Sequence, residues 1–298
     1  MIHVNSGETV NDLFVKEDEM YVHSTGVANG TIVDKDGWVY VSKGGILNNT
    51  YINKDGEVDL LSSGSANATQ IMTDGILNVG EKAVAIGTVV EGGTLVIESK
   101  GIASDTTVNG PGQMYVFSGG KTKGTTTVND GGFLTLEWES IHSSAIIHGG
   151  KLTVLGGPAD GDMAFLQNFT VDSGGSLTVS GSVLVSSGTI TDGWAKVTSD
   201  GTLEKVTLNA ATVEVKNGAL LSNADMKTGT LVNIASGGVI RKLAVSKGAV
   251  LTGVLRDVSE LHFDGGTLDL NISGIAPGGE FLIGDTAYSA YISGSSYN

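Results

Sequence analysis

The sequence predicts an all-β fold, a single-stranded parallel β-helix or β-solenoid of about a dozen coils of about 19 residues each. Three observations predict it. One motif returns along most of the chain at a nearly constant spacing. Apolar and polar residues alternate within each copy, which is the period of a β-strand. Glycine is abundant, at 45 of 298 residues, yet 40% of the residues are hydrophobic, so the glycines punctuate an ordered structure.

A threonine that precedes a Val or Ile expected to be buried marks each copy of the repeat. The unit reads T-x-[VI]-x-x-D-G-x-[VL]-x-[VL]-x-x-G-G-x-x-x-x. A spacing this regular is typical of solenoids, in which each copy forms one coil. The clearest copies begin at Thr31, Thr50, Thr69, Thr88, Thr106 and Thr126, at intervals of 19, 19, 19, 18 and 20 residues.

Each unit predicts two short strands joined by glycine corners. Val39 and Val41 flank Tyr40, so one face of this strand points inward and the other outward. The Asp-Gly and Gly-Gly pairs suit turns with positive φ. Stacked copies bury the inner face and exchange backbone hydrogen bonds. Because right-handed crossovers are the default for parallel strands, we expect a right-handed helix.

The spacing also predicts the domain organisation. Residues 1–270 form the solenoid, and a loop insertion at about 156–168 interrupts it, because this stretch is longer than the unit allows. The repeat decays after Leu270. Since solenoid ends need covering, residues 271–298 are expected to form a C-terminal cap or the start of a truncated following region.

Composition excludes several classes of function. The formal net charge is -15, and Arg241 and Arg256 are the two arginines, so no nucleic-acid partner is expected. Cysteine is absent, which excludes disulfides and thiolate metal sites. No apolar run of about 18 residues occurs, so this segment is not expected to insert into a membrane. The first residues lack the pattern of a signal peptide, and an excised segment of a larger precursor is expected if the protein is exported.

The cadence of the motif resembles the AIDA-type repeats of bacterial autotransporter adhesin passengers. The resemblance covers about residues 12–270 and implies a right-handed β-helix carried across the outer membrane by a C-terminal translocator. It implies a non-enzymatic protein, at the bacterial cell surface or secreted, that acts in adhesion, self-association or biofilm formation. Some family members are glycosylated on Ser and Thr. The closest copies run from Thr31 to Asn49, Thr50 to Ala68, Thr106 to Gly124 and Thr126 to Ser144.

Two other functions remain open. Parallel β-helices include polysaccharide lyases and hydrolases, but the N-T-D, D-D and G-H-G motifs of polygalacturonase-like members are absent. A passive structural spacer is the other alternative. The expected partners of an adhesin are host or bacterial surface glycans or proteins, or further copies of the chain. No cofactor is expected.

Two sets of residues are candidates for a site. Asp36, Asp55 and Asp74 are expected to stack in a corner column, with Asp18 before them. Carboxylates about 5 Å apart suit a retaining glycosidase or Ca²⁺, although Asp-Gly is also a preferred turn pair. Lys35 and Lys54, beside two of these corners, can relieve the repulsion between the carboxylates.

The aromatic residues are the second set. Tyr21, Tyr40 and Tyr115 occupy the same outward position of their units, and Trp38 lies two residues from Tyr40. Exposed rings favour a binding surface for sugars, whereas cross-strand stacking explains them as stabilising contacts. The five histidines are expected to be solvated coil residues, and a weak metal site at His142 and His148, near Asp160 and Asp162, is the alternative.

Overall fold

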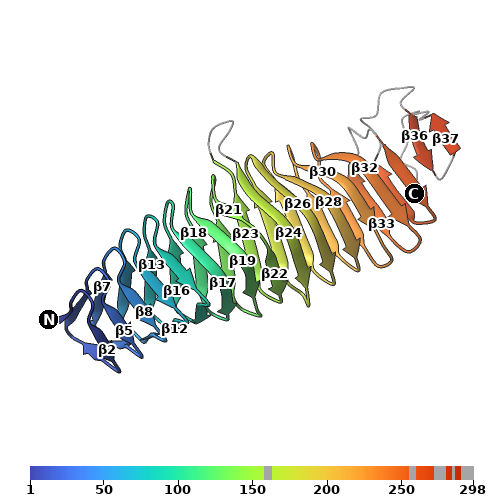
Figure 1. Ribbon diagram of the computed structural model, residues 1–298. Helices are drawn as coiled ribbons and strands as arrows, with labels where there is room; N and C mark the ends of the chain where they lie inside the picture. Colours follow the sequence, from blue (N-terminus) through green and yellow to red (C-terminus); the bar gives the residue numbers. More distant parts are fainter. Residues whose placement is uncertain (158–162, 255–259, 272–279, 284–285, 290–298) are drawn as a thin grey trace. The chain divides into compact units, whose positions relative to one another are not determined.

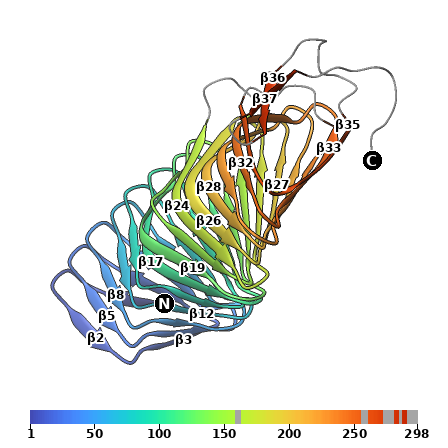
Figure 2. The ribbon, with the colours of Figure 1, turned by 90° about the vertical axis from the view of Figure 1, so that its right-hand side faces the viewer.

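The computed structural model describes residues 1–157, 163–254, 260–271, 280–283 and 286–289. The chain divides into two compact units, Met1–Leu152 (unit 1) and Thr153–Asn298 (unit 2). Each unit is built from β-strands that wind as a parallel solenoid, as predicted from the repeat. Figures 1 and 2 show the coils of each unit stacked one behind another. Within the described part of the chain, no helix has the length and hydrophobicity needed to cross a membrane.

Unit 1 contributes one strand per coil to a first parallel sheet. Neighbouring strands are one coil apart in sequence, and Tyr21, for example, is in register with Tyr40. Eight coils follow from the strands of this sheet. They are β1 (Ile2–Val4), β4 (Glu19–Val22), β7 (Trp38–Val41), β10 (Glu57–Leu60), β13 (Ile76–Val79), β16 (Thr94–Ile97), β18 (Gln113–Val116) and β20 (Phe133–Leu136).

A second, bent sheet completes each coil of unit 1 with two further strand segments. The expected two strands per coil are therefore wrong, and most coils have three. In β17 and β19 the two segments merge, with an irregularity between Ser104 and Thr106. The strands are β2 (Thr9–Asn11), β3 (Phe14–Lys16), β5 (Val27–Asn29), β6 (Ile32–Asp34), β8 (Ile46–Asn48), β9 (Tyr51–Ile52), β11 (Ser65–Asn67), β12 (Gln70–Met72), β14 (Val84–Ile86), β15 (Val89–Glu91), β17 (Ile102–Asn109), β19 (Lys121–Val128), β21 (Ile141–His142) and β22 (Ala145–His148).

Unit 2 repeats this plan with longer strands, and its described residues give six coils. Strand β23 (Lys151–Leu155) contains the boundary between the units. The first sheet holds β25 (Ser176–Ser180), β27 (Trp194–Thr198), β29 (Thr212–Val215), β31 (Leu231–Ile234), β33 (Val250–Val254) and β35 (Thr267–Asn271). The second holds β24 (Ala164–Asp172), β26 (Val183–Thr191), β28 (Thr202–Asn209), β30 (Leu220–Met226), β32 (Val239–Ser246) and β34 (Leu261–Asp264).

The predicted interruption is shorter than expected. Residues 164–168, placed in the loop at about 156–168, lie in β24, and residues 158–162 are outside the described part of the chain. Of the expected cap at 271–298, the structure describes an antiparallel pair, β36 (Glu280–Ile283) and β37 (Thr286–Ser289). The remainder of that segment after Asn271 is not described, so its role as a cap stays a prediction.

Alternate strand residues fill the interior. Val39, Val41, Leu77 and Val79 are at most 1% exposed, while Tyr40 points outward and is half-buried. A side chain of this kind contributes roughly 1.5–3 kcal/mol on leaving water. Each inward residue stacks on its counterpart one coil away. The stacked columns together form a core that a single repeat cannot make.

The Asp-Gly corners differ from the expected turn. Asp36, Asp55 and Asp74 take the left-handed conformation, with φ of 54°, 58° and 61°. Gly37 has ordinary φ, but a Cβ there would lie 2.3 Å from the carbonyl oxygen of Val15 in the preceding coil. The aspartate therefore provides the turn, and the glycine allows the close approach of two coils.

The threonines that mark the repeat are buried, not surface residues. All six are at most 1% exposed. Each lies at the bend between the two second-sheet segments of its coil. Five of the six Oγ1 atoms make no hydrogen bond in the structure, those of Thr31, Thr50, Thr69, Thr88 and Thr106. The repeat is thus anchored by a side chain with the shape of valine and an unpaired hydroxyl.

Candidate functional site

The first sheet of unit 1 carries a ladder of stacked rings on its outer surface. Tyr21 and Tyr40, in register on β4 and β7, have ring centroids 5.1 Å apart and planes inclined by 23°. His3, one coil earlier, stacks on Tyr21 at 5.5 Å. Tyr21 therefore has a neighbouring ring on both sides along the solenoid, whereas Tyr40 has Tyr21 on one side and Asp59 in register on the other.

Trp38 lies beside this ladder and is 40% exposed. Its ring centroid is 6.3 Å from that of Tyr40 on the same strand. Along the solenoid it lies in register between Glu19 and Glu57. Tyr21, Trp38 and Tyr40 thus lie close together on adjacent coils, at the positions predicted. Their role in binding stays a prediction.

Tyr115 occupies the same column but a different neighbourhood. Four coils separate it from Tyr40, about 19 Å at the usual strand spacing. Its ring lies 6.2 Å from Phe117, which is 38% exposed. Phe133, on β20 one coil later, is 39% exposed and has the ammonium of Lys151 5.3 Å above its ring. Neither phenylalanine was predicted as a candidate from the sequence, although Phe133 stands at the position of Trp38 in the repeat.

Carboxylates flank the rings of the ladder. The side-chain amide of Asn78 donates to both Glu57 and Asp59, each at 2.8 Å. Burial and the charge of Asp59 raise the pKa of Glu57 above its usual value. The phenol of Tyr21 donates to Glu19 at 2.8 Å, which raises the pKa of this tyrosine. The surface around the ladder is therefore negative.

The aspartate corners do stack at intervals of one coil, as expected. Asp36 donates its backbone N–H to the carbonyl of Asp55 at 3.0 Å, and all three aspartates are exposed. Lys54 lies 3.9 Å from Asp74, and Lys35 lies 3.3 Å from Glu17. Lys54 thus pairs with one aspartate of the column, whereas Lys35 pairs with Glu17 and with none of the three.

The head of the corner column differs from the prediction. Glu17, with φ of 51°, takes the left-handed corner position of the first coil, whereas Asp18 stands where later coils have the crowded glycine. Asp18 binds the amino terminus of the chain. No group of three or more potential metal ligands occurs among the described residues.

His142 is buried, so the expectation of a solvated residue is wrong for this histidine. It is 3% exposed, with Nδ1 2.7 Å from Thr122 Oγ1 and Nε2 3.0 Å from the carbonyl oxygen of Ser144. Since a carbonyl only accepts, Nε2 carries the proton and Nδ1 accepts from the threonine. Burial lowers the pKa of His142 to about 4. His148 is exposed, as expected.

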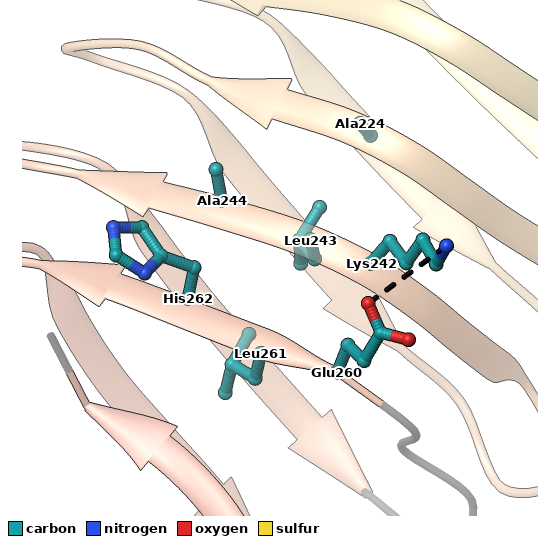
Figure 3. A pocket seen from close by; sticks show the side chains of 7 residues that line it. All are labelled: Ala224, Lys242, Leu243, Ala244, Glu260, Leu261 and His262. Atoms are coloured by element: carbon teal, nitrogen blue, oxygen red, sulfur yellow. Dashed lines mark ion pairs between the residues drawn. The ribbon is translucent and has the colours of Figure 1, made fainter. Parts of the chain in front are cut away.

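Two hollows in the surface are lined in part by charged side chains. In unit 2 a hollow of about 360 Å³ lies along β30, β32 and β34 (Figure 3). Lys242 and Glu260 form an ion pair of 3.9 Å in it. In unit 1 a hollow of about 270 Å³ is lined by the acidic residues Asp59, Glu81 and Glu98.

The structure is similar to the crystal structure of a hyper-glycosylated fragment of TibA, residues 55–350, whose glycosylation TibC catalyses. The TM-score is 0.77 at 23% sequence identity, and the likeness covers 90% of this chain and 98% of the fragment. The TibA fragment is an AIDA-type autotransporter adhesin passenger. The chain has the fold of such a passenger. The resemblance predicted from the repeat is therefore confirmed at the level of the fold.

Two further solved structures match the chain at TM-scores too low to indicate a shared fold. Two trypsin-treated variants of QnrB1, a plasmid-mediated fluoroquinolone resistance protein, are 14% and 12% identical over 84% and 88% of this chain, and over 87% and 91% of their own chains. Their TM-scores are 0.16 and 0.14. No protein-family model and no curated protein matches the sequence.

Proposed function

We propose that this chain is a non-enzymatic passenger segment of an exported bacterial adhesin, displayed at the cell surface beyond the outer membrane or secreted. The observation that carries the proposal is the likeness to the TibA fragment over 90% of the chain. Its role is adhesion, self-association or biofilm formation. The partners are surface glycans or proteins of host or bacterial cells, or further copies of the chain.

The geometry of the solenoid supports a function spread over its faces. Outward side chains repeat at each coil, so a face offers a row of similar groups to a partner surface. The half-buried rings of Tyr21, Tyr40 and Tyr115 and the exposed ring of Trp38 share the outer surface of one sheet of unit 1. Aromatic residues are enriched at the energetic centres of protein interfaces.

Deletion of residues 1–270 from the precursor in the producing bacterium tests the proposal. We expect loss of cell aggregation, of adherence to host cells or of biofilm, with the precursor still exported. Immunoblotting of surface fractions provides the export control. Unchanged aggregation, adherence and biofilm would refute the proposal. Replacement of these residues by an unrelated rod of similar length separates adhesion from a spacer, because a spacer would keep its function.

A carbohydrate-active enzyme is the second candidate, and one observation favours it. Glu57 and Asp59 share the amide of Asn78, and the raised pKa of Glu57 is a property of acid catalysts. Incubation with a panel of acidic polysaccharides, followed by assays for reducing ends and unsaturated products, decides between the two. Products that form with the wild-type chain and not with Glu57→Gln would show an enzyme and would contradict the adhesin proposal. We expect none, since the pair lies on an open sheet surface.

Covalent glycosylation is a further expectation from the TibA fragment. Half-buried outward hydroxyls such as those of Thr94, Thr135 and Thr178 are accessible, whereas the repeat threonines are buried. Co-expression with TibC and mass spectrometry of peptides should find sugar on outward Ser and Thr. The peptide that contains Thr50 should stay unmodified at that residue, and sugar on Thr50 would contradict the structure.

A further inference from the structure

The outer surface of the first sheet of unit 1 combines aromatic residues with carboxylates that have no cationic partner. We call the outward residues of β1, β4, β7, β10, β13, β16, β18 and β20 the aromatic face. It contains no lysine or arginine. In residues 1–152, all of which the structure describes, the carboxylates of Glu19, Glu57 and Asp59 form no ion pair.

The equivalent sheet of unit 2 shows the contrast. There Lys196 lies in register with Glu214, and Lys216 forms an ion pair with Glu214 at 3.4 Å. Carboxylates on a sheet surface are thus compensated in one unit and left uncompensated in the other. A partner surface that meets the aromatic face must bring positive charge, since like charges suppress association.

The ring geometry helps to distinguish a glycan from a basic protein segment as the partner. A sugar ring packs on a free aromatic face, but both faces of Tyr21 are covered by His3 and Tyr40. Lysine and arginine need no such face, because their methylene stems pack along apolar edges while their charged ends reach carboxylates. Lysine already contacts a ring of this face within the chain, since the Lys151 ammonium lies over the ring of Phe133 at 5.3 Å from its centroid.

We infer that the aromatic face docks a basic protein segment rich in lysine or arginine, with its stems along Trp38 and Tyr40 and its charges at Glu19, Glu57 and Asp59. This inference rests on the proposed function and names the class of partner. The four-coil distance from Tyr40 to Tyr115, about 19 Å, suits an extended segment that follows the sheet.

The experiment measures binding of a labelled ten-residue peptide of alternating lysine and leucine to the purified chain by fluorescence anisotropy. We expect binding that weakens as salt is raised. Glu57→Gln with Asp59→Asn should weaken it by about tenfold. Trp38→Leu should weaken it by about threefold without changing the salt dependence. Circular dichroism confirms that each variant is folded.

A matched control removes the same charge from another face of unit 1. Asp34→Asn with Glu91→Gln, on β6 and β15, should change the affinity less than about twofold, since these groups lie outside the aromatic face. Equal weakening by both pairs would mean that the peptide responds to the net charge of -15 and would overturn the inference. Failure of the peptide to bind would also overturn it.

A cationic glycan provides the last comparison. A fully deacetylated chitosan oligomer of similar charge should bind more weakly than the peptide. Tighter binding of the oligomer would overturn the inference in favour of a sugar-binding face. Each of these negative results leaves the adhesion assay of the precursor deletion unaffected, so failure of the inference and failure of the proposed function can be told apart.

Discussion

The threonine that marks each copy of the repeat places an unpaired hydroxyl in the core of unit 1. A buried hydroxyl without a partner costs about 1–3 kcal/mol relative to one that is hydrogen-bonded. Thr230 in unit 2 shows the satisfied alternative, because its Oγ1 donates to the carbonyl of Leu208 at 2.8 Å. The two environments make opposite predictions for the same substitution.

Thr50→Val should raise the free energy of opening of its coil by about 1 kcal/mol, since valine keeps the shape and removes the unpaired group. Thr230→Val should lower the corresponding free energy by about 1 kcal/mol through loss of a hydrogen bond. Hydrogen exchange of the amides of β9 and β30 measures both. A destabilising Thr50→Val would show that the hydroxyl has a partner in solution.

His142 should make the stability of its coil depend on pH. Its pKa falls from the ordinary 6.5 to about 4 in the folded protein, so between these values the unfolded chain binds a proton that the folded one does not. The free energy of unfolding of this coil is therefore highest above pH 6.5. It decreases by about 3 kcal/mol as the pH falls towards 4.

Hydrogen exchange of β21 and β22 at pH 7 and pH 4 checks this expectation, after correction for the intrinsic rates. In His142→Gln the difference between the two pH values should shrink by most of that amount. His148→Gln, which removes an exposed imidazole from the same coil, is the control. An unchanged difference in His142→Gln would contradict the assignment.

Residue positions were predictable from the sequence where the period of two is strong. The common column of Tyr21, Tyr40 and Tyr115 follows from that period. The covering of both faces of Tyr21 does not, because it depends on ring orientation in three successive coils. The burial of His142 was missed for a related reason, since a polar residue at an inward position reads as a loop residue.

At the scale of the elements, one strand in each coil of unit 1 was not predicted, because it lacks the alternation of apolar and polar residues. Strands β5, β8 and β11 have one buried residue each, Ala28, Leu47 and Ala66. A single inward residue produces no alternation, so these positions read as the variable end of the repeat. The strands exist because the coils on either side already bring their backbones into register.

The two kinds of corner glycine should respond differently to substitution. Gly37→Ala should destabilise its coil by about 1–3 kcal/mol, because the added Cβ would lie 2.3 Å from the carbonyl oxygen of Val15. Gly44 has φ of 76° and open space around it, with the nearest atom at 3.6 Å. Gly44→Asn should therefore cost less than about 1 kcal/mol, since asparagine tolerates this conformation. Urea unfolding of both variants checks the order, and a reversed order would contradict the role given to close approach.

At the scale of the whole molecule, the fold class followed from the spacing of the repeat, but the division into two compact units did not. The insertion that follows the boundary at Leu152 lengthens the spacing there, but a longer spacing alone does not show that the chain divides into two units. The length of the insertion was also overestimated, because β24 begins at Ala164 with residues that do not match the motif.

The modular construction predicts which deletions are tolerated. Removal of residues 50–87 takes out 38 residues, two repeats of 19, and joins Asn49 to Thr88 at equivalent corners. This variant should remain folded, because each coil contacts its neighbours alone. Removal of residues 50–77 breaks the register and should unfold the adjoining coils. Circular dichroism with limited proteolysis distinguishes the two, and equal sensitivity to protease would contradict the expectation.

The hydrogen bonds between coils also determine how a unit yields to force. Each coil is bonded to the one before it by contacts such as the backbone N–H of Ser42 to the carbonyl of Val22, at 2.9 Å. A stacked coil occupies about 5 Å of the axis, whereas its residues span about 65 Å when drawn out straight. Pulled from its ends, a unit would lengthen in successive steps of about 60 Å as coils detach one by one. In the adhesin proposed above, this stepwise lengthening would absorb the work done by flowing liquid while the contact with a surface holds.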